Sequence, residues 1–200
     1  MLAEAHDPVD ALRIYHEVAG RRPVEPQALE GTGQMAFQLA RYKMARTFLD
    51  RALKASSTAH SLADRALAEK NLQIANAVMA IYPSEDLPRR ERLRRVLHAH
   101  DVAQKRYEAC ANGTAGDTTT PQNGSTQIQN NQQMAALGNR WESMRPKLTV
   151  AALADDPQLE QATMQLIYDT EQVTAQVCGE PAGENAALLR IAQSPDSIDR

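Results

Sequence analysis

Five arginines fall within seven consecutive positions near the middle of the chain: Arg89, Arg90, Arg92, Arg94 and Arg95. They stand at the start of a segment with helical periodicity, where the helix macrodipole disfavours positive charge. We therefore expect these guanidinium groups to have anionic partners. A nucleic-acid site would need interleaved aromatic side chains or a recognised module, and this run has neither.

The anionic partners could lie in the same chain, because its two halves carry opposite charge. Residues 1–111 contain 17 Lys and Arg against 14 Asp and Glu, whereas residues 112–200 contain 5 against 11. The arginines could instead form a solvated basic face or bind an external anionic partner. If the acidic half neutralises the arginines, the candidates are Asp155, Asp156, Glu160, Asp169 and Glu171.

The two cysteines, Cys110 and Cys178, each stand at the end of an expected helix. A disulfide between them would stabilise the fold by roughly 4 kcal/mol in the chain-entropy model. The alternative is a pair of buried thiols. An exported parent protein favours the bridge and a cytosolic one favours the thiols, so the localisation stays open between the cytoplasm and the cell envelope or periplasm.

Other reactive side chains form no recognisable catalytic or metal-binding pattern. Two widely spaced cysteines exclude a cysteine-only zinc site, and Gly31-Thr32-Gly33 lies inside an expected helix rather than in a phosphate-binding loop. No nucleophile stands at a recognisable spacing from the histidines, which are His6, His16, His60, His98 and His100. We therefore expect a non-enzymatic protein without metal or cofactor. No apolar run reaches the ~18 residues of a membrane span.

The elements that must position these side chains all have the helical period, and no segment alternates as a strand would. Asp7 and Pro8 supply an N-cap and a first-turn proline. Tyr82-Pro83 ends a later helix, because the residue before proline resists the helical conformation. The expected helices cover about 8–19, 26–40, 43–55, 59–81, 84–110, 134–144, 148–153, 157–179 and 183–193.

One stretch between the two halves, residues 112–133, is polar almost throughout. Its only apolar side chains are those of Ala115 and Ile128. Burial therefore cannot offset the entropy that is lost when such a stretch is ordered. We expect a flexible polar linker here.

The first helices repeat with a period of 34 residues. A shift by this amount places Ala11 on Ala45, Tyr15 on Leu49 and Val18 on Ala52. In the second copy, small and large residues follow the order that is typical of a tetratricopeptide repeat, namely Leu29, Gly33, Ala45, Leu49 and Ala52. On these residues the N-terminal part of the chain resembles the tetratricopeptide repeat family.

The resemblance implies two antiparallel helices that cross closely. Gly33 and Ala45 are small at this crossing, and Leu49 fills the space beside it. The chain departs from the family where a tryptophan, a tyrosine and a closing proline are usual, at Leu29, Ala36 and Ser57. This makes the repeat similar to the degenerate bacterial type.

The ends of the repeat array are atypical. The helix at 59–81 is too long for the first helix of a repeat, so we expect it to cap the array. The first copy lacks its own first helix, so we expect either a longer parent chain or another element that covers this face. From Tyr82 onward the chain resembles the tail of uncharacterised bacterial tetratricopeptide proteins, through the arginine run and Val177-Cys178-Gly179-Glu180-Pro181.

The predicted fold is therefore all-α. It has a helical-hairpin solenoid of tetratricopeptide type with its long cap at 1–81 and a long arginine-rich helix at 82–111. The linker at 112–133 leads to a C-terminal helical segment at 134–200 that packs back on the long helix.

The resemblance implies a scaffold that binds a protein or peptide partner in the groove of its first helices. The expected groove residues lie opposite Leu29 and Gly33 and are Gln27, Glu30, Gln34 and Gln38. They lack the lysines and asparagines with which chaperone-binding members hold a C-terminal carboxylate, so that ligand is disfavoured.

The alternative is an enzyme or a small-molecule-binding helical domain. Its site would lie between the arginine-rich helix and the acidic tail. Convergent groups with shifted pKa values in a deep pocket would favour this alternative, and a shallow exposed groove would favour the scaffold.

Overall fold

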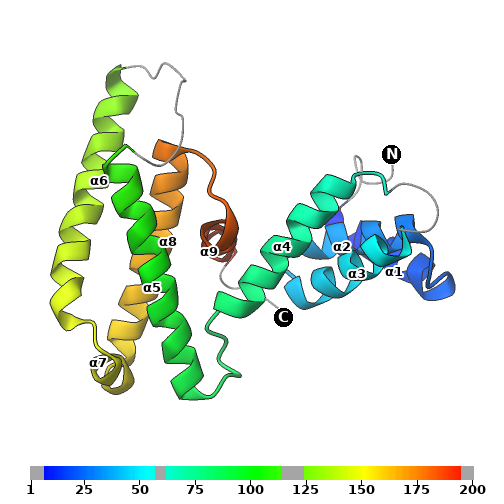
Figure 1. Ribbon diagram of the computed structural model, residues 1–200, viewed down its shortest axis with the longest axis horizontal. Coiled ribbons are helices and arrows are strands. Elements are labelled where there is room, and N and C mark those ends of the chain that lie inside the picture. Colours follow the sequence, from blue (N-terminus) through cyan, green and yellow to red (C-terminus); the bar gives the residue numbers. More distant parts are fainter. Residues whose placement is uncertain (1–6, 57–61, 114–123, 195–200) are drawn as a thin grey trace. The chain divides into compact units, whose positions relative to one another are not determined.

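The computed structural model describes residues 7–56, 62–113 and 124–194 (Figure 1). Every regular element in these residues is helical, which confirms the all-α class. In the same residues, no helix has both the length and the apolar character that crossing a membrane requires. The helices are α1 (Pro8–Arg21), α2 (Pro26–Gln38), α3 (Tyr42–Ala55), α4 (Arg65–Ile81), α5 (Arg89–Ala111), α6 (Gly124–Met144), α7 (Val150–Asp155), α8 (Pro157–Cys178) and α9 (Gly183–Gln193).

The chain divides into two compact units. The N-terminal unit holds residues 1–79 with 194–200, and the C-terminal unit holds residues 80–193. This division differs from the predicted one, which separated the arginine-rich helix at 82–111 from the segment at 134–200. The two belong to one unit because α5 packs along α8 and also contacts α7 and α9.

The first helix begins as the sequence predicts. The side chain of Asp7 accepts a hydrogen bond from the N–H of Val9 at 3.0 Å, and Pro8 occupies the first turn, where its missing N–H costs no helical hydrogen bond. The stop expected at Gly20 is slightly early. α1 ends at Arg21, and the N–H of Arg22 closes the last turn by donating to the carbonyl of Val18.

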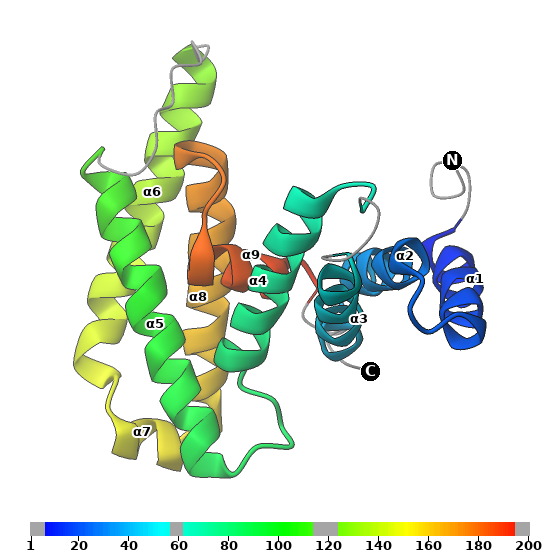
Figure 2. The ribbon, with the colours of Figure 1, turned by 45° about the vertical axis from the view of Figure 1, so that its right-hand side comes forward.

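The second helix, α2, packs against both α1 and α3 (Figure 2). A Cβ atom added at Gly33 would stand 2.6 Å from Cγ of Leu49 on α3, and one added at Gly31 would stand 2.5 Å from the ring of Tyr15 on α1. Both distances are too short for a side chain, so the predicted close crossing at Gly33 is confirmed. Tyr15 and Leu49 are also the pair that the 34-residue shift superposes.

The beginning of α4 differs from the prediction, which started this helix at 59. Residues 57–61 lie outside the described part of the chain, and the helix begins at Arg65. Asp64 sets this start, since its carboxylate accepts the N–H of Leu67 at 2.9 Å. Glu30 on α2 accepts the N–H groups of the preceding turn, at 2.8 Å from Ala63 and 3.1 Å from Asp64.

The C-terminal unit is built on α5 and α8, which run in the same direction (Figure 1). Arg92 contacts Glu160 near the beginning of both helices, and Cys110 is bonded to Cys178 at their ends. Both pairs are 68 residues apart in sequence, so the two helices keep one register along their length. α6 packs on α8, and α9 packs on α8 and α5.

The linker predicted at 112–133 is wrong over its second half, because α6 begins at Gly124. Leu137 and Trp141 are buried and anchor this helix in the unit. Glutamine is a good helix former. The polar residues at the beginning of α6 therefore continue the helix whose later part is stabilised by the packing of Leu137 and Trp141. Residues 114–123 of the predicted linker lie outside the described residues.

A first prediction concerns the crossing of α2 and α3. Gly33→Ala should lower the free energy of unfolding by roughly 1–3 kcal/mol, because the added methyl group would overlap Leu49. The matched control is Gly20→Ala on α1, where an added Cβ meets nothing within 4 Å and alanine favours the helix by about 1 kcal/mol. Urea unfolding followed by circular dichroism measures both variants. Equal midpoints would contradict the close crossing.

Candidate functional site

The groove predicted on α2 is partly covered in the structure. Gln27 and Gln38 are exposed, as the prediction requires. Glu30 is only 4% exposed and holds the turn before α4, so the prediction that it faces an open groove is wrong. Gln34 is half-buried, and its side-chain oxygen accepts a hydrogen bond from the amide of Asn71 on α4 at 2.8 Å. The start of α4 occupies this part of the face.

An open pocket of about 350 Å³ lies between α3 and α4 in the N-terminal unit. Its described lining consists of Arg46, Thr47, Asp50, Arg51, Leu72 and Asn76. None of these residues was predicted from the sequence as part of a site. For the four residues on α3, the available signal was the exposed side of the helix expected at 43–55, since Ala45, Leu49 and Ala52 occupy its buried side. Leu72 and Asn76 lie on α4.

Two of the five clustered arginines bind groups in the C-terminal half of the chain. Arg89 donates to the carbonyls of Leu153 and Ala154, which end α7. Arg92 forms an ion pair with Glu160 on α8, with 2.9 Å between Nε and Oε1 and both side chains mostly buried. The expected neutralisation by the acidic half is therefore seen for Arg92, whereas Arg90 is exposed.

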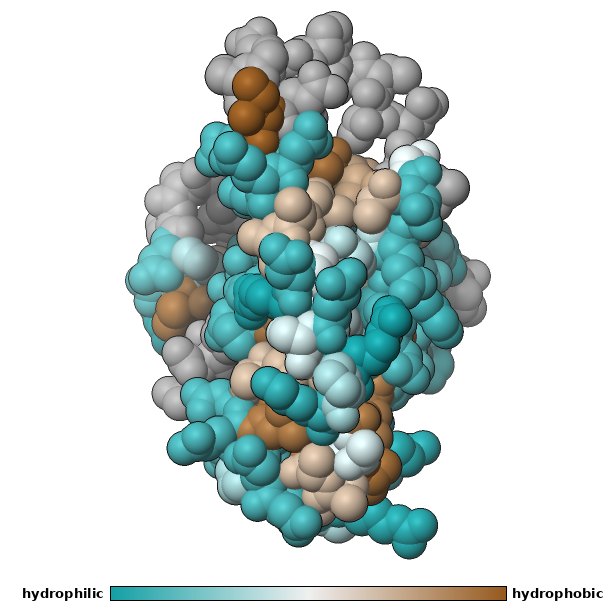
Figure 3. Space-filling view, turned by 90° about the vertical axis from the view of Figure 1, so that its left-hand side faces the viewer, coloured by the Kyte–Doolittle hydropathy of each residue, from teal (hydrophilic) through white to brown (hydrophobic). Residues whose placement is uncertain are grey.

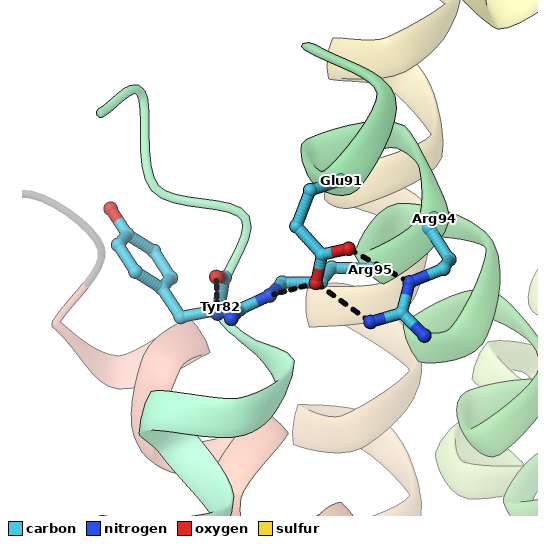
Figure 4. A network of polar contacts seen from close by, with 4 residues as sticks. All are labelled: Tyr82, Glu91, Arg94 and Arg95. Atoms are coloured by element: carbon cyan, nitrogen blue, oxygen red, sulfur yellow. Dashed lines mark hydrogen bonds and ion pairs between the residues drawn. The ribbon is translucent and has the colours of Figure 1, made fainter. Parts of the chain in front are cut away.

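Two further arginines bind a carboxylate on their own helix (Figure 4). Arg94 donates twice to Glu91, at 2.8 and 2.9 Å, and Arg95 donates to it at 3.3 Å. The hydrogen bond from Arg94, followed in size of effect by the one from Arg95, lowers the pKa of the Glu91 carboxyl group. The hydrogen bond to Glu91 in turn raises the pKa of Arg94. Arg95 also donates to the carbonyl of Tyr82 at 2.9 Å.

Glu91 was not predicted as a partner, because the acidic candidates were sought in the other half of the chain. The spacing of three and four residues to Arg94 and Arg95 was the available signal, since such pairs meet on one helix face. The structure therefore distributes the arginines over partners on α5, α7 and α8.

The other acidic candidates have different roles. Asp156 caps α8, accepting the N–H groups of Gln158 and Leu159. Asp169 pairs with Arg140 on α6 at 2.6 Å rather than with the arginine cluster. Asp155 is exposed at the end of α7.

Glu171 is the one candidate that is completely buried. Neither oxygen of its carboxylate has a hydrogen-bond partner among the described residues. Burial raises the pKa of Glu171 to about 8, and the nearby charge of Arg106 lowers it by less. The 68-residue register of α5 and α8 places the buried residue Ala103 level with Glu171. Glu171 is therefore mostly protonated at neutral pH.

The histidines described on α5 contact different elements. The rings of His100 and Trp141 pack in a T-shaped arrangement with 4.8 Å between centroids, and Trp141 donates to the hydroxyl of Thr170 at 3.2 Å. His98 lies 2.8 Å from Glu184 on α9. These contacts join α5 to α6 and α9, and α6 to α8. Among the described residues no group of acidic, histidine or cysteine side chains could hold a metal ion. His6 and His60 lie outside those residues.

A second pocket, of about 240 Å³, lies between α6 and α8. Its described lining is largely apolar, with Leu137 and Val173, and its charged residues Arg140 and Asp169 already bind one another. Its other polar residues are Gln133 and Gln172, and Gln172 donates to the carbonyl of Ala192. Figure 3 shows the face of the molecule on the α6 side, where hydrophilic side chains dominate and apolar ones gather in the lower part. The pocket therefore offers few groups that could orient a polar ligand.

The structure joins Cys110 and Cys178 by a disulfide. Their Cα atoms are 5.8 Å apart, within the limit of about 7 Å that such a bond requires. Arg106 reinforces this end of the unit by donating to the carbonyl of Gly179 at 2.6 Å. The geometry thus meets the condition for a bridge between the ends of α5 and α8.

No protein-family model, no curated protein and no solved structure matches this chain.

A second prediction concerns the disulfide. Alkylation should modify neither Cys110 nor Cys178 unless the protein is first reduced, and reduction should lower the free energy of unfolding by roughly 4 kcal/mol. Mass spectrometry and urea unfolding provide the two measurements. The Cys110→Ser/Cys178→Ser double variant is the control, because reductant should not change its midpoint. Alkylation of both thiols without reductant would contradict the bridge.

A third prediction concerns Glu171. An ordinary glutamate has a pKa near 4.5 and the buried one about 8, so the folded state binds more protons between these values. The free energy of unfolding should therefore fall with rising pH across this window, by up to about 1.4 kcal/mol per pH unit.

Glu171→Gln should flatten this dependence and raise the unfolding midpoint most near pH 8. Glu142→Gln, which changes an exposed glutamate of α6, is the matched control and should keep the wild-type slope. Chemical unfolding from pH 4.5 to 8.5 gives the measurement. Parallel curves for wild type and Glu171→Gln would show that Glu171 has an ordinary pKa.

Proposed function

We propose that this protein is a non-enzymatic scaffold that binds a protein or peptide partner through its N-terminal unit. We further propose that this unit is a degenerate array of tetratricopeptide type. Two kinds of support carry this proposal: the sequence resemblance and the contacts that α2 makes with α1, α3 and α4.

The observation that carries the proposal is the spacing of the contacts between α2 and α4. Glu30 binds residues 33 and 34 positions further along the chain, and Gln34 binds a residue 37 positions further along. From Glu30 to Gln34 the partners advance from the turn before α4 to Asn71 on α4, an order that fits two helices running in the same direction at an offset of about one 34-residue repeat. A solenoid of helical hairpins has this relation between the first helices of successive units.

The distribution of open surface also supports a binding function for the N-terminal unit. Gln27 and Gln38 stay exposed on α2, and the pocket between α3 and α4 is open and lined mostly by polar side chains. A shallow polar surface on a rigid helical frame suits a peptide better than it suits an enclosed small molecule.

The enzyme alternative receives less support. Its site was expected between the arginine-rich helix and the acidic tail. The arginines that would form this site already donate to groups of the C-terminal unit, as Arg89, Arg92 and Arg95 do. Glu171, the carboxyl group with a strongly raised pKa, lines neither described pocket. The three arginines stabilise the helical packing, whereas Glu171 is buried without a hydrogen-bond partner among the described residues.

A fourth prediction tests the scaffold. The tagged full chain is incubated with lysate of its native host, treated with a lysine cross-linker and analysed by mass spectrometry. A specific partner should be cross-linked to lysines of the N-terminal unit, which are Lys43, Lys54 and Lys70. Cross-links confined to Lys105 and Lys147 would place binding on the C-terminal unit and contradict the proposal.

A further inference from the structure

The pocket between α3 and α4 has a distinct chemistry, because positive groups dominate its described lining. Arg46 is exposed at the pocket. Arg51 is half-buried and held in place, since it donates to the carbonyl of Pro23 at 2.9 Å and lies 5.3 Å from the centre of the Phe48 ring. A guanidinium group that is already positioned loses little freedom when it binds a carboxylate.

The acidic residue of the described lining does not cancel this charge. Asp50 pairs with Lys54 one helical turn away, with 2.6 Å between the charged atoms. Arg46 and Arg51 therefore leave the pocket with a net positive charge. Such a pocket attracts anionic groups, and the guanidinium fork suits a carboxylate in particular.

The remaining lining residues suit a peptide. Leu72 is half-buried and offers an apolar surface, and Asn76 is exposed, so its amide can both donate to and accept from a peptide bond. The hydroxyl of Thr47 donates to the carbonyl of Lys43 at 2.9 Å, which leaves its oxygen able to accept.

A nucleic acid fits the pocket less well. Base stacking needs an open aromatic face, and none of the described lining residues is aromatic. Phe48 lies on the same helix as the lining residue Arg51. His16 approaches the ring of Phe48 with 5.3 Å between centroids, and Arg51 lies over it.

We propose that the pocket between α3 and α4 binds an acidic peptide segment of the partner. Arg46 and Arg51 hold a side-chain carboxylate, and Leu72 contacts a neighbouring apolar side chain. This inference rests on the proposed scaffold function and assigns the chemistry of its partner.

The test uses the full chain and a capped hexapeptide that alternates glutamate with leucine, so that neither terminus carries a charge. The comparison peptide has glutamine in place of glutamate. Calorimetry at low ionic strength should give at least about tenfold tighter binding of the glutamate peptide, and this binding should weaken as salt is added.

Two variants locate the binding. Arg46→Gln should weaken the glutamate peptide about tenfold, because it removes a charge-assisted hydrogen-bond donor. Arg13→Gln is the matched control on α1, outside the described lining, and should leave the affinity unchanged. Arg51→Gln should also weaken binding of the glutamate peptide. Because Arg51 also donates to the carbonyl of Pro23, thermal unfolding of this variant shows whether the N-terminal unit remains folded.

Several outcomes would overturn the inference: no binding of the glutamate peptide at low salt, equal binding of the two peptides, or an affinity that Arg46→Gln does not change. These outcomes are distinct from failure of the scaffold. A partner that cross-links to the N-terminal unit of wild type and Arg46→Gln equally would preserve the scaffold and overturn the acidic-peptide pocket.

Discussion

The parallel direction of α5 and α8 is the constraint on which the C-terminal unit depends. α5 has 23 residues and is roughly 35 Å long, so a chain that leaves its end must travel back before it can start α8 beside it. α6 and α7 make this return. Parallel helices also bring two positive dipole ends together. The acidic residues Glu91, Asp156 and Glu160 stand at these ends, where they offset both the dipoles and the arginines.

The N-terminal unit depends instead on glycines at the places where its helices cross. Gly31 and Gly33 allow α2 to approach Tyr15 and Leu49 closely, and each bulky residue fills the space that its glycine leaves. Glu30 then ties the turn before α4 to the same helix. α2 thus contacts α1, α3 and the turn before α4.

Much of this fold follows from local sequence signals, and the failures share a cause. The cap at Asp7, the small residue at Gly33 and the positions of most helices are local properties that a sequence displays. The role of Glu30 is not local, because a glutamate on the polar side of a helix looks like a surface residue until α4 covers it. The pocket between α3 and α4 was missed for the same reason. The second part of α6 matches the helix expected at 134–144, but its first ten residues, 124–133, were missed because a polar composition does not show that a segment continues into a helix anchored further along.

The bond between Cys110 and Cys178 closes the intervening chain into a covalent ring that contains α6, α7 and α8. A protease that cuts any single peptide bond within this ring leaves one covalent molecule, since the two new ends remain connected through the sulfur atoms. Under reducing conditions the same cut releases two polypeptides. The fate of a nicked molecule therefore depends on the redox potential of its surroundings, even where its folded structure does not.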